Sequence, residues 1–524
     1  MRRIGIDVGG TNTDAVLIED DAVRCSVKTA TSEDVLGGIR TALSALLAAT
    51  ASADETGPLD AVVIGTTHFT NAVIERRGLQ RVGALRIGLP ASASLPPFVD
   101  WPEDLAAMVC GVVEMVAGGH EYDGRPIVPL DRSGVRDAAR RMADQEIAAV
   151  GISSVFSPLT AECEEEAARI VREELPEASI TLSHDLGRIG LLERENVTLL
   201  NASLQDLARR VTDAFTAALG ESGIVAPLYL SQNDGTIMRT ELARRFPVYG
   251  FASGPTNSMR GAAYLSGLAE GVVVDVGGTT SDIGYLKDGF PREANAAVDI
   301  GGVRTLFRMP DLLSLGLGGG TIIAADRAPD WQANWGPESR IGPESVGFRL
   351  SEEAIAFGGR TLTASDVAIA AGRLTLGEPA RLARLDRDLV ARLLARMAAM
   401  LAEGVDRMKT EAGDVPLLAV GGGSFLIPDR LEGCSEVIRV PHYAVANAVG
   451  AAIAQVSGEV DQVFAGLSRA AAITAAQELA QGRAVAAGAR RESLQFVEVE
   501  DIPLSYLPGD ARRVRVRVIG DIGA

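Results

Sequence analysis

Cysteine, histidine and aromatic residues are scarce in this chain of 524 residues, and each shortage excludes a class of protein. The four cysteines (Cys25, Cys110, Cys163 and Cys434) form no CxxC pair, so we expect neither a disulfide framework nor a zinc knuckle. The four histidines have no metal-ligand spacing such as HxxxH. Aromatic residues make up 4% of the chain against 57 glycines, which favours an α/β protein with many tight loops over a nucleic-acid-binding protein.

Long apolar runs are also missing. No window approaches 18 consecutive apolar residues, and the opening MRRIGIDVGG has no apolar signal-peptide core behind its two arginines. A formal net charge of −19 repels nucleic acids and anionic membrane surfaces. We therefore expect a cytoplasmic protein that binds neither nucleic acid nor membrane. The length predicts two or three domains.

The hydrophobic pattern alternates between strands and helices, as in a layered α/β domain. Apolar strands at 4–8 and 15–18 flank a glycine turn, which predicts a hairpin. Residues 80–130 are rich in Pro and Gly and give no clear pattern. The further predicted elements are helix 33–49, strand 60–65, helix 66–78, helix 133–143, strand 147–155, helix 188–221, strand 417–420, an Ala-rich helix at about 461–488, and two strand-like pieces at 496–504 and 512–520.

The most informative feature is an internal repeat. IGIDVGGTNTDAVLI at 4–18 and VVVDVGGTTSDIGYL at 272–286 both give an apolar strand, Asp-Val-Gly-Gly-Thr, a second aspartate and another apolar strand. The two leading aspartates, Asp7 and Asp275, are 275 − 7 = 268 residues apart. A third glycine turn, VGGGSFL at 420–426, follows a predicted strand. We therefore predict two similar halves, each carrying one glycine turn.

Each turn carries the groups that a phosphate site needs. Glycine lets backbone N–H groups approach phosphate oxygens, and a carboxylate at a strand end can hold Mg²⁺ directly or through water. The alternative for a single turn is a strand-turn-strand without a ligand, but two near-copies favour a clamp around one triphosphate. The predicted groups are Asp7, Asp275 and Asp282 for the metal, with Asp14 in its hydrated shell; Asp7, Asp275, Thr11 and Thr279 for catalysis; Gly9, Gly10, Asn12, Thr13, Gly277, Gly278 and Thr280 for the phosphates; and Gly421, Gly422, Gly423 and Ser424 under adenosine.

The chain resembles the hydantoinase A/5-oxoprolinase family, a branch of the superfamily of acetate and sugar kinases, heat-shock proteins and actin (ASKHA). The segments that carry the resemblance span roughly residues 1–455 and follow the family order. They include IGIDVGGTNTDAVLI, VIGTTHFTNAVIERRG, LLERENVTLLNASL, PLYLSQNDGTI, FASGPTNSMRGAAYL, VVVDVGGTTSDIG and LLSLGLGGGTI. Two departures concern the substrate side: Thr256–Asn257 follow the Ser-Gly-Pro segment where the family has Ala and Gly, and His68 takes an apolar position.

The resemblance implies a fold, cofactors and a reaction. It implies an α/β, two-lobed actin/hexokinase-like (ASKHA) fold with duplicated phosphate-loop domains and a small C-terminal element. The expected units are an N-terminal lobe at 1–190, a second lobe at 191–457 and a C-terminal helix and strand element at 458–524. It also implies ATP, Mg²⁺ and the ring opening of a cyclic amide (a hydantoin, lactam or 5-oxoproline) by phosphorylation of the amide oxygen and attack of water. Such proteins often act with a second hydantoinase-type subunit, and we expect an oligomer.

Several further residues are candidates for ligand contact. Thr66, Thr67, His68 and Asn71 follow a buried strand at the start of a helix, where they could contact the substrate; for the threonines, N-capping is the alternative. Ser253 and Gly254 could touch the nucleotide or form a turn, and Gly316, Gly318, Gly319 and Gly320 could let the backbone pass near the cleft. His120, His184 and His442 are expected to be hydrogen-bonding residues, and His68 is the best candidate for proton transfer.

Three other functions remain open for such a chain. A small-molecule kinase would release a phosphorylated product without opening a ring. A non-catalytic ATP-driven switch would hydrolyse ATP slowly and bind a protein client. An energising subunit of a ketone carboxylase would need bicarbonate and partner chains.

Overall fold

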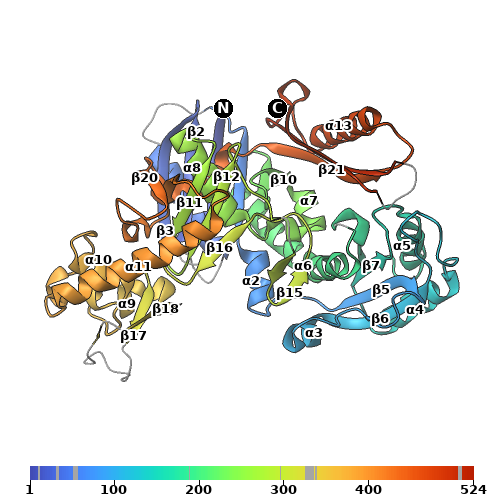
Figure 1. The fold of residues 1–524 in the computed structure, drawn as a ribbon, viewed down its shortest axis with the longest axis horizontal. Coiled ribbons are helices and arrows are strands. Elements are labelled where there is room, and N and C mark those ends of the chain that lie inside the picture. Colours follow the sequence, from blue (N-terminus) through green and yellow to red (C-terminus); the bar gives the residue numbers. More distant parts are fainter. Residues whose placement is uncertain are drawn as a thin grey trace.

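The computed structural model describes residues 1–9, 12–30, 35–50, 57–187, 189–294, 297–324, 335–336, 339–505 and 510–523. Figure 1 shows two central sheets side by side, with one further unit at each end of the long axis. Gly10 and Thr11, which were predicted to contact phosphate, lie outside the described residues. Among the helices described, none is both long and apolar enough to cross a membrane.

The first sheet has nine strands in the order β22-β23-β21-β10-β9-β4-β1-β2-β3. Strand β1 pairs antiparallel with β2 and parallel with β4, and β4 pairs parallel with β9. Helix α1 (Val35–Thr50) covers this sheet with Ile39, Leu43 and Leu46, which are buried at helical spacing. The bounds are β1 Arg2–Val8, β2 Asn12–Glu19, β3 Ala22–Ala30, β4 Ala61–Thr66, β9 Leu228–Ser231, β10 Ile237–Arg239, β21 Val456–Phe464, β22 Gln495–Pro503 and β23 Arg512–Gly520.

The second sheet repeats the central arrangement of the first. Its order is β13-β12-β11-β19-β20, with β16 also pairing with β12. Strand β11 pairs antiparallel with β12 and parallel with β19, as β1 does with β2 and β4. The bounds are β11 Gly271–Val276, β12 Ser281–Lys287, β13 Phe290–Pro291, β16 Leu312–Leu315, β19 Val415–Val420 and β20 Cys434–Arg439. The same strand order in both lobes confirms the predicted two-lobed fold with duplicated glycine turns.

The register of the paired strands shows that the two lobes correspond residue by residue at the ends of their hairpins. Asp7 lies opposite Asp14 on β1 and β2, and Asp275 lies opposite Asp282 on β11 and β12. Each lobe therefore ends its first hairpin with a facing pair of aspartates beside a glycine turn.

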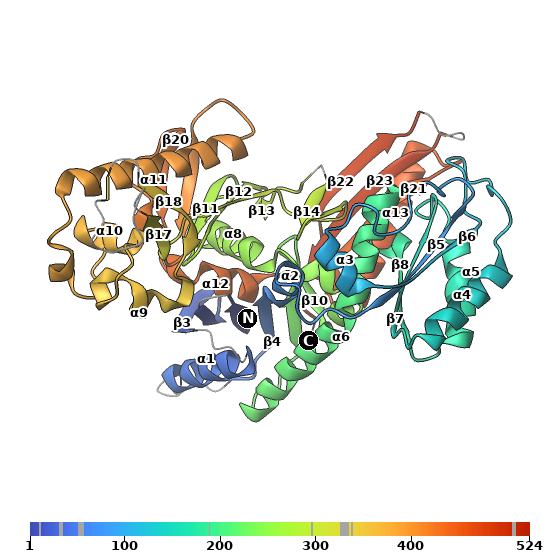
Figure 2. The same ribbon diagram turned by 90° about the horizontal axis from the view of Figure 1, so that it is seen from below.

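Two helices cross between the sheets, α8 (Ser253–Ser266) and α12 (Ala446–Ile453). Helix α8 leads into β11 of the second sheet, and α12 leads back into β21 of the first. Figure 2 shows both helices at the centre, between the two lobes. Their backbones approach so closely that a Cβ at Gly261 would overlap the carbonyl oxygen of Ala446, and one at Gly450 would overlap that of Asn257. Glycine is therefore required at the crossing.

Two outer units extend the lobes (Figure 1). One is a four-stranded parallel sheet in the order β6-β5-β7-β8 with its own apolar core, flanked by α4 and α5. The other contains α9, α10, α11 and the β17–β18 hairpin. The remaining bounds are α2 His68–Ile74, β5 Val82–Leu89, α3 Glu103–Val109, β6 Cys110–Ala117, α4 Arg132–Asp144, β7 Ala149–Ser154, α5 Glu162–Glu174, β8 Ser179–Leu182, α6 Leu191–Glu221, α7 Thr240–Arg245, β14 Val298–Ile300, β15 Val303–Thr305, β17 Thr321–Ala324, β18 Arg340–Ser345, α9 Leu350–Glu353, α10 Ala364–Ala370, α11 Arg387–Met408 and α13 Arg469–Ala486.

The C-terminal region differs from the prediction in one element. The Ala-rich helix begins at Arg469 rather than near 461, because residues 456–464 form strand β21. In β21 the buried residues alternate with less buried ones, which is the period of a strand. Strand β23 pairs with β21, and β21 with β10, so the C-terminal element joins the first sheet. Strands β9 and β10 also belong to that sheet, although the predicted division at 190/191 and 457/458 assigns them to the second lobe.

Candidate active site between the two glycine turns

The two glycine turns are closed by equivalent backbone hydrogen bonds. The Gly9 N–H donates to the Asn12 carbonyl at 3.0 Å, and the Gly277 N–H donates to the Thr280 carbonyl at 2.8 Å. Thr279 and Thr280 are exposed, whereas the Thr13 side chain is buried. The equivalent hydrogen bonds show that the sequence repeat is also a repeat of local structure.

Asp7 is buried at the end of β1 and is held by two amides. Asn447 at the start of α12 donates to its Oδ2 at 2.9 Å, and Asn257 on α8 donates to its Oδ1 at 3.5 Å. Burial, together with the charge of Asp14, raises the pKa of Asp7 to about 7, against the lowering effect of the two amides. A Cβ at Gly65 on β4 would overlap Asn257. The crossing helices therefore fix the orientation of this carboxylate.

Asp275 takes the equivalent place in the second lobe. The hydroxyl of Ser258, on α8, donates to its Oδ2 at 2.5 Å. A Cβ at Gly421 would overlap its Oδ1, and Gly421 has a φ of +86°, so this turn brings backbone directly against the carboxylate. Burial raises the pKa of Asp275. Helix α8 thus contributes Asn257 to one lobe's aspartate and Ser258 to the other's.

The partner aspartates of the two hairpins have different neighbours. Asp14 forms an ion pair with Lys28, with an N–O distance of 2.6 Å, while Asp282 accepts a hydrogen bond from Ser314. Burial raises the pKa of Asp282 to about 6, and the charge of Asp275 adds to this effect. Burial also raises the pKa of Asp14, against the influence of Lys28.

The aspartates of both lobes share one electrostatic environment. The charge of Asp275 raises the pKa of Asp7, and the charge of Asp14 raises the pKa of Asp275. Within the described part of the chain, no three His, Cys, Asp or Glu side chains are close enough to hold a metal ion alone. The buried carboxylates of Asp7 and Asp275 are of the kind that holds Mg²⁺, which keeps several waters and takes one or two carboxylates together with phosphate oxygens.

Two glycine segments pack around the second turn. The Gly319 and Gly320 N–H groups donate to the Gly277 and Gly278 carbonyls at 3.0 and 2.7 Å, and the Gly423 N–H donates to the Val276 carbonyl at 2.7 Å. Ser424 is buried. Gly422 differs, because a Cβ there would meet nothing within 4 Å. Gly422, one of the residues predicted to lie under adenosine, therefore faces open space.

The predicted substrate residues lie between β4 and α2, beside the end of β1. The Thr67 hydroxyl donates to the Val8 carbonyl at 3.5 Å, and Asn71 donates to Thr67 at 3.3 Å. The Thr66 hydroxyl contacts the His68 ring nitrogen Nδ1. Burial lowers the pKa of His68 to about 4, so its imidazole is neutral near pH 7. Thr67 is the N-cap residue of α2, but its side chain makes no capping hydrogen bond.

Ser253 is the first residue of α8 and has a structural contact. Its hydroxyl donates to the Thr66 carbonyl at 2.9 Å and accepts from the Thr66 N–H at 3.2 Å. It therefore fixes the end of β4. Of the other histidines, His184 donates from its ring to Glu164 at 2.7 Å, and His442 has a φ of +59° before a short 3-10 helix.

The residues that sequence reasoning missed are those that hold Asp7, Asp14 and Asp275. Asn257, Ser258 and Asn447 come from helices distant in sequence from the glycine turns, and Lys28 lies opposite Asp14 on the neighbouring strand β3. Asn257 had a signal, since an amide replaces a small residue after Ser-Gly-Pro, and a buried asparagine in a helix needs a partner. Asn447 had none, because its contact with Asp7 depends on how α12 packs.

Comparison with known proteins identifies the family. Residues 3–175 match the family described as hydantoinase/oxoprolinase N-terminal region, and residues 194–416 match hydantoinase/oxoprolinase. Caprolactamase subunit alpha of Pseudomonas jessenii is 26% identical over 495 residues, covering 84% of this chain and 68% of that protein. The acetophenone carboxylase gamma subunit of Aromatoleum aromaticum is 27% identical over 412 residues, covering 71% of this chain and 53% of that protein. The chain thus spans about two thirds of the first relative and about half of the second.

Solved structures support the same fold. The crystal structure of ATP-dependent caprolactamase from Pseudomonas jessenii matches with a TM-score of 0.80 and 21% identity, over 99% of this chain and 87% of that chain. A nucleotide-free acetone carboxylase matches with a TM-score of 0.69 and 18% identity, over 100% of this chain and 88% of that chain. The two matched regions together cover most of the sequence, from residue 3 to 416. The chain therefore belongs to the hydantoinase/oxoprolinase family, with the two-lobed fold that its repeated sheets display.

Proposed function

We propose that this protein is an ATP-dependent hydrolase that opens the ring of a cyclic amide such as a hydantoin, a lactam or 5-oxoproline. The observation that carries the proposal is the pair of aspartate-ended strands, one from each lobe, held by the same helix through Asn257 and Ser258. The caprolactamase relative supports the choice of a cyclic amide as the substrate.

In this proposal ATP lies between the lobes, with its phosphates at the two glycine turns. Asp7, Asp275 and Asp282 would hold Mg²⁺, with Asp14 in its hydrated shell, and bound Mg²⁺ would neutralise charge on the phosphates. Three features suit these ligands: carboxylates whose pKa values are raised by burial, glycine backbone that approaches Asp275, and the open space beside Gly422. Thr11, Asn12, Thr13, Thr279 and Thr280 would contact the phosphates, and residues 421–424 would lie under adenosine.

The chemistry explains why ATP is needed. An amide carbonyl is a poor electrophile, so transfer of the γ-phosphoryl group to the amide oxygen gives ADP and a much more reactive imidate. Water then adds to the carbon, the ring C–N bond breaks with a proton going to nitrogen, and a second water releases phosphate from the acyl phosphate. One ATP and two waters thus yield ADP, phosphate and the ring-opened acid. The protein's part is positioning and charge neutralisation.

The substrate would lie near Thr66, Thr67, His68 and Asn71. These residues follow β4, whose end lies beside Asp7 through the register of β1 and β4. With its pKa lowered to about 4 by burial, His68 is a neutral hydrogen-bonding group near pH 7. A neutral imidazole suits an uncharged amide better than a charged side chain would.

A partner subunit belongs to the proposal. The relatives are named as the alpha subunit of a caprolactamase and the gamma subunit of acetophenone carboxylase. We propose that this chain likewise assembles with a second hydantoinase-type subunit into an oligomer, and that it acts in the cytoplasm.

A ketone-activating role is the second candidate, because acetophenone and acetone carboxylase subunits are also relatives. In that reaction the phosphorylated oxygen would belong to a ketone or to bicarbonate. The same cleft would serve, and only the acceptor would differ.

A screen of ADP release separates these candidates. Purified protein, with and without a co-expressed partner, is supplied with ATP, Mg²⁺ and hydantoins, lactams, 5-oxoproline, or ketones with bicarbonate. We expect ADP release with a cyclic amide and an equal amount of ring-opened acid. ADP release only with ketone and bicarbonate would support the carboxylase role, and stoichiometric phosphorylated product would indicate a kinase. If none of these compounds causes ADP release, with or without the partner, the proposal is contradicted.

A further inference from the structure

Lys28 is a positively charged side chain beside the cleft aspartates, and the proposed function gives it no role. It lies on β3 directly opposite Asp14 of β2, and Asp14 in turn lies opposite Asp7 of β1. Side chains at one register position of neighbouring strands share a face of the sheet. A row of three charged residues therefore crosses three strands beside the first glycine turn, and Lys28 is at its end.

The Lys28 side chain is held by one carboxylate and stays partly exposed to solvent. Its Nζ lies 2.6 Å from Asp14 Oδ1 and 2.8 Å from Asp14 Oδ2. The Asp14 side chain is 3% exposed, whereas the Lys28 side chain is 34% exposed. Among the described residues, Lys28 is the one lysine or arginine that forms an ion pair with any of the four aspartates at 7, 14, 275 and 282. A buried carboxylate thus holds an accessible cation at this place.

The charge of Lys28 acts on aspartates of both lobes. Burial raises the pKa of Asp14, and Lys28 opposes this rise through its charge and its hydrogen bond. Burial also raises the pKa of Asp275, and the hydrogen bond of Ser258 and then the charge of Lys28 oppose that rise. Because electrostatic effects weaken with distance, Lys28 lies close enough to influence the carboxylates beside both glycine turns.

Lysine is rare in this chain. Only three of its 50 Lys and Arg residues are lysines, namely Lys28, Lys287 and Lys409. Arginine pairs with a carboxylate through two parallel N–H groups in a fixed geometry, whereas lysine carries a compact charge on a flexible stem. An arginine at position 28 would be held more rigidly by Asp14. The lysine therefore favours a cation that can also serve another anion.

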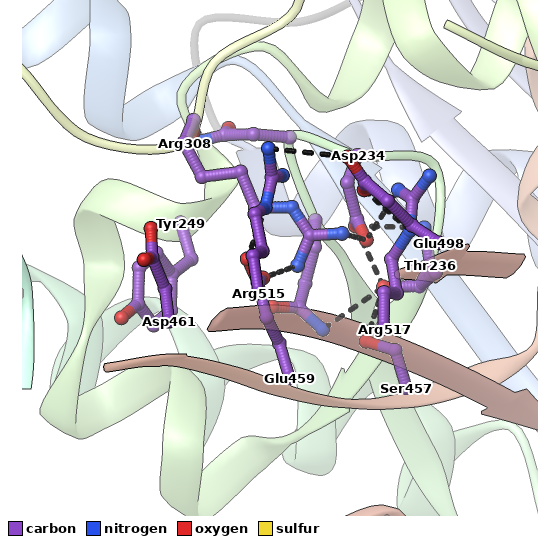
Figure 3. Close-up of polar contacts among 12 residues, drawn as sticks. Asp234, Thr236, Tyr249, Arg308, Ser457, Glu459, Asp461, Glu498, Arg515 and Arg517 are labelled. Carbon is purple, nitrogen blue, oxygen red and sulfur yellow. Dashed lines mark hydrogen bonds and ion pairs between the residues drawn. The ribbon is translucent and has the colours of Figure 1, made fainter. Parts of the chain in front are cut away.

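Buried carboxylates elsewhere in the molecule are neutralised by arginine. In the network of ion pairs in Figure 3, Arg308 pairs with both Asp234 and Glu459. Arg515 also pairs with Glu459, with an Nε–Oε1 distance of 3.1 Å. Shared partners of this kind fix the position of each charge. Lys28 differs, because among the described residues its ion pairing involves a single carboxylate.

We propose that the ammonium group of Lys28 contacts the terminal phosphate of bound ATP. The inference rests on the part of the proposed function that places ATP between the two glycine turns. In that arrangement adenosine lies over residues 421–424, which pack against the second turn, where the Gly423 N–H donates to the Val276 carbonyl at 2.7 Å. The phosphate chain then runs from the second turn toward the first, and Lys28, beside the first turn, meets its end.

The chemistry of an ammonium group suits this contact. It has three N–H donors, so Lys28 can keep a hydrogen bond to Asp14 while it donates to a phosphate oxygen. ATP brings further negative charge to a cleft that contains aspartates, and a cation at the end of the phosphate chain offsets part of the repulsion. Lys28 would thus distinguish ATP from ADP, which lacks the terminal phosphate.

Nucleotide binding to the full-length protein tests the proposal without any turnover. Isothermal titration in the presence of Mg²⁺ measures the dissociation constants of ADP and of adenylyl imidodiphosphate, an ATP analogue that keeps the terminal phosphate. In Lys28→Gln we expect the preference for the analogue over ADP to fall about 10-fold or more, because only the analogue reaches Lys28. Arg24→Gln is the matched control, since Arg24 is a cation on the same strand that pairs with Glu19, and it should leave the preference unchanged.

A double variant separates phosphate contact from simple neutralisation of Asp14. Asp14→Asn combined with Lys28→Gln removes both charges of the pair, so that no buried carboxylate is left unpaired. We expect the preference for the analogue to remain low in this double variant. Recovery of the wild-type preference would show that Lys28 only neutralises Asp14 and would overturn the proposal. An unchanged preference in Lys28→Gln would overturn it as well.

The same titrations distinguish this proposal from the proposed function. Wild-type protein that binds neither nucleotide would refute both. Wild-type protein that binds both nucleotides, with the same preference in every variant, would refute only the role of Lys28. Loss of the preference in Lys28→Gln and in the double variant, in a protein that opens no cyclic amide, would refute ring opening and leave the phosphate contact of Lys28 standing.

Discussion

At the scale of single residues, the two lobes hold their aspartates by different chemical groups in the same place. Asp7 receives amide hydrogen bonds from Asn257 and Asn447, whereas Asp275 receives a hydroxyl hydrogen bond from Ser258. Neither has a lysine or arginine as its direct partner among these contacts. A buried carboxylate held by neutral donors keeps its attraction for a cation, which suits a metal-bound nucleotide.

Gly421 is the residue on which the second aspartate's geometry depends most. In Gly421→Ala the new Cβ would overlap Asp275 Oδ1, and a φ of +86° is strained for any side chain. We expect a loss of about 1–3 kcal/mol in the free energy of unfolding, measured by urea denaturation. Gly422→Ala is the matched control, since its Cβ would meet nothing within 4 Å. Equal stability of the two variants would contradict the close approach of this turn to Asp275.

Histidine titration tests the electrostatics of two buried sites. Burial lowers the pKa of His184, but the hydrogen bond and charge of Glu164 outweigh it and raise the pKa above 6.5. His68 has only the burial effect, with a pKa of about 4. With four histidines in the chain, NMR of labelled histidine should show one group that titrates above 6.5 and one that stays neutral to about pH 4.

Of the two histidine pKa values, the variant Glu164→Gln should change only that of His184. Burial is then opposed only by the charges of Asp185 and Glu165, so we expect the pKa of His184 to fall. Because the folded pKa is raised, the pair's contribution to stability is full below about pH 6.5 and is lost as the pH rises through the folded pKa. In Glu164→Gln this loss on raising the pH should disappear. An unchanged His184 titration would show that Glu164 is not its partner.

At the scale of elements, helices α8 and α12 cross between the lobes and also hold the aspartates of the proposed active site. They cross with glycine at the contact, and the same two helices supply Asn257, Ser258 and Asn447 to the aspartates. Any change in the angle of this crossing therefore moves the hydrogen-bond donors of both carboxylates.

Gly450→Ala tests this coupling. Its Cβ would overlap the Asn257 carbonyl, so we expect destabilisation by about 1–3 kcal/mol and weaker ATP binding. Gly220→Ala, in α6 with nothing within 4 Å, should instead be neutral or stabilising by up to about 1 kcal/mol. Urea denaturation and nucleotide titration measure both effects. Normal ATP affinity in a destabilised Gly450→Ala protein would show that the helix crossing does not affect the ATP site.

Secondary-structure elements with a clear local hydrophobic pattern could be predicted from the sequence. The repeat at 4–18 and 272–286 predicted both hairpins, and the facing aspartates follow from their register. The predicted start of α13 was wrong because the segment before it, in which buried and less buried residues alternate, forms strand β21. This strand pairs with strands that are distant in sequence. The carboxylate-holding residues could not be predicted from spacing, since Asn447 reaches Asp7 across 440 residues.

At the scale of the whole molecule, two similar lobes meet at helices α8 and α12, and the C-terminal region lines a separate cavity. The C-terminal strands supply Glu459 and Arg515 to the network of ion pairs in Figure 3. The C-terminal region therefore extends the first sheet and also lines a cavity that no described residue of the two glycine turns contacts.

In the proposed function, Asp7 and Asp275 together enable ATP-driven ring opening. The most direct test measures ADP and ring-opened acid in parallel, with the best cyclic amide, for the wild type and for Asp7→Ala, Asp275→Ala and the exposed control Asp406→Ala. We expect equal amounts of both products in the wild type and the control, and a loss of at least about 100-fold in the rate of product formation in each of the Asp7→Ala and Asp275→Ala variants. Substrate-dependent ADP release that survives in Asp7→Ala or Asp275→Ala would contradict the proposed function.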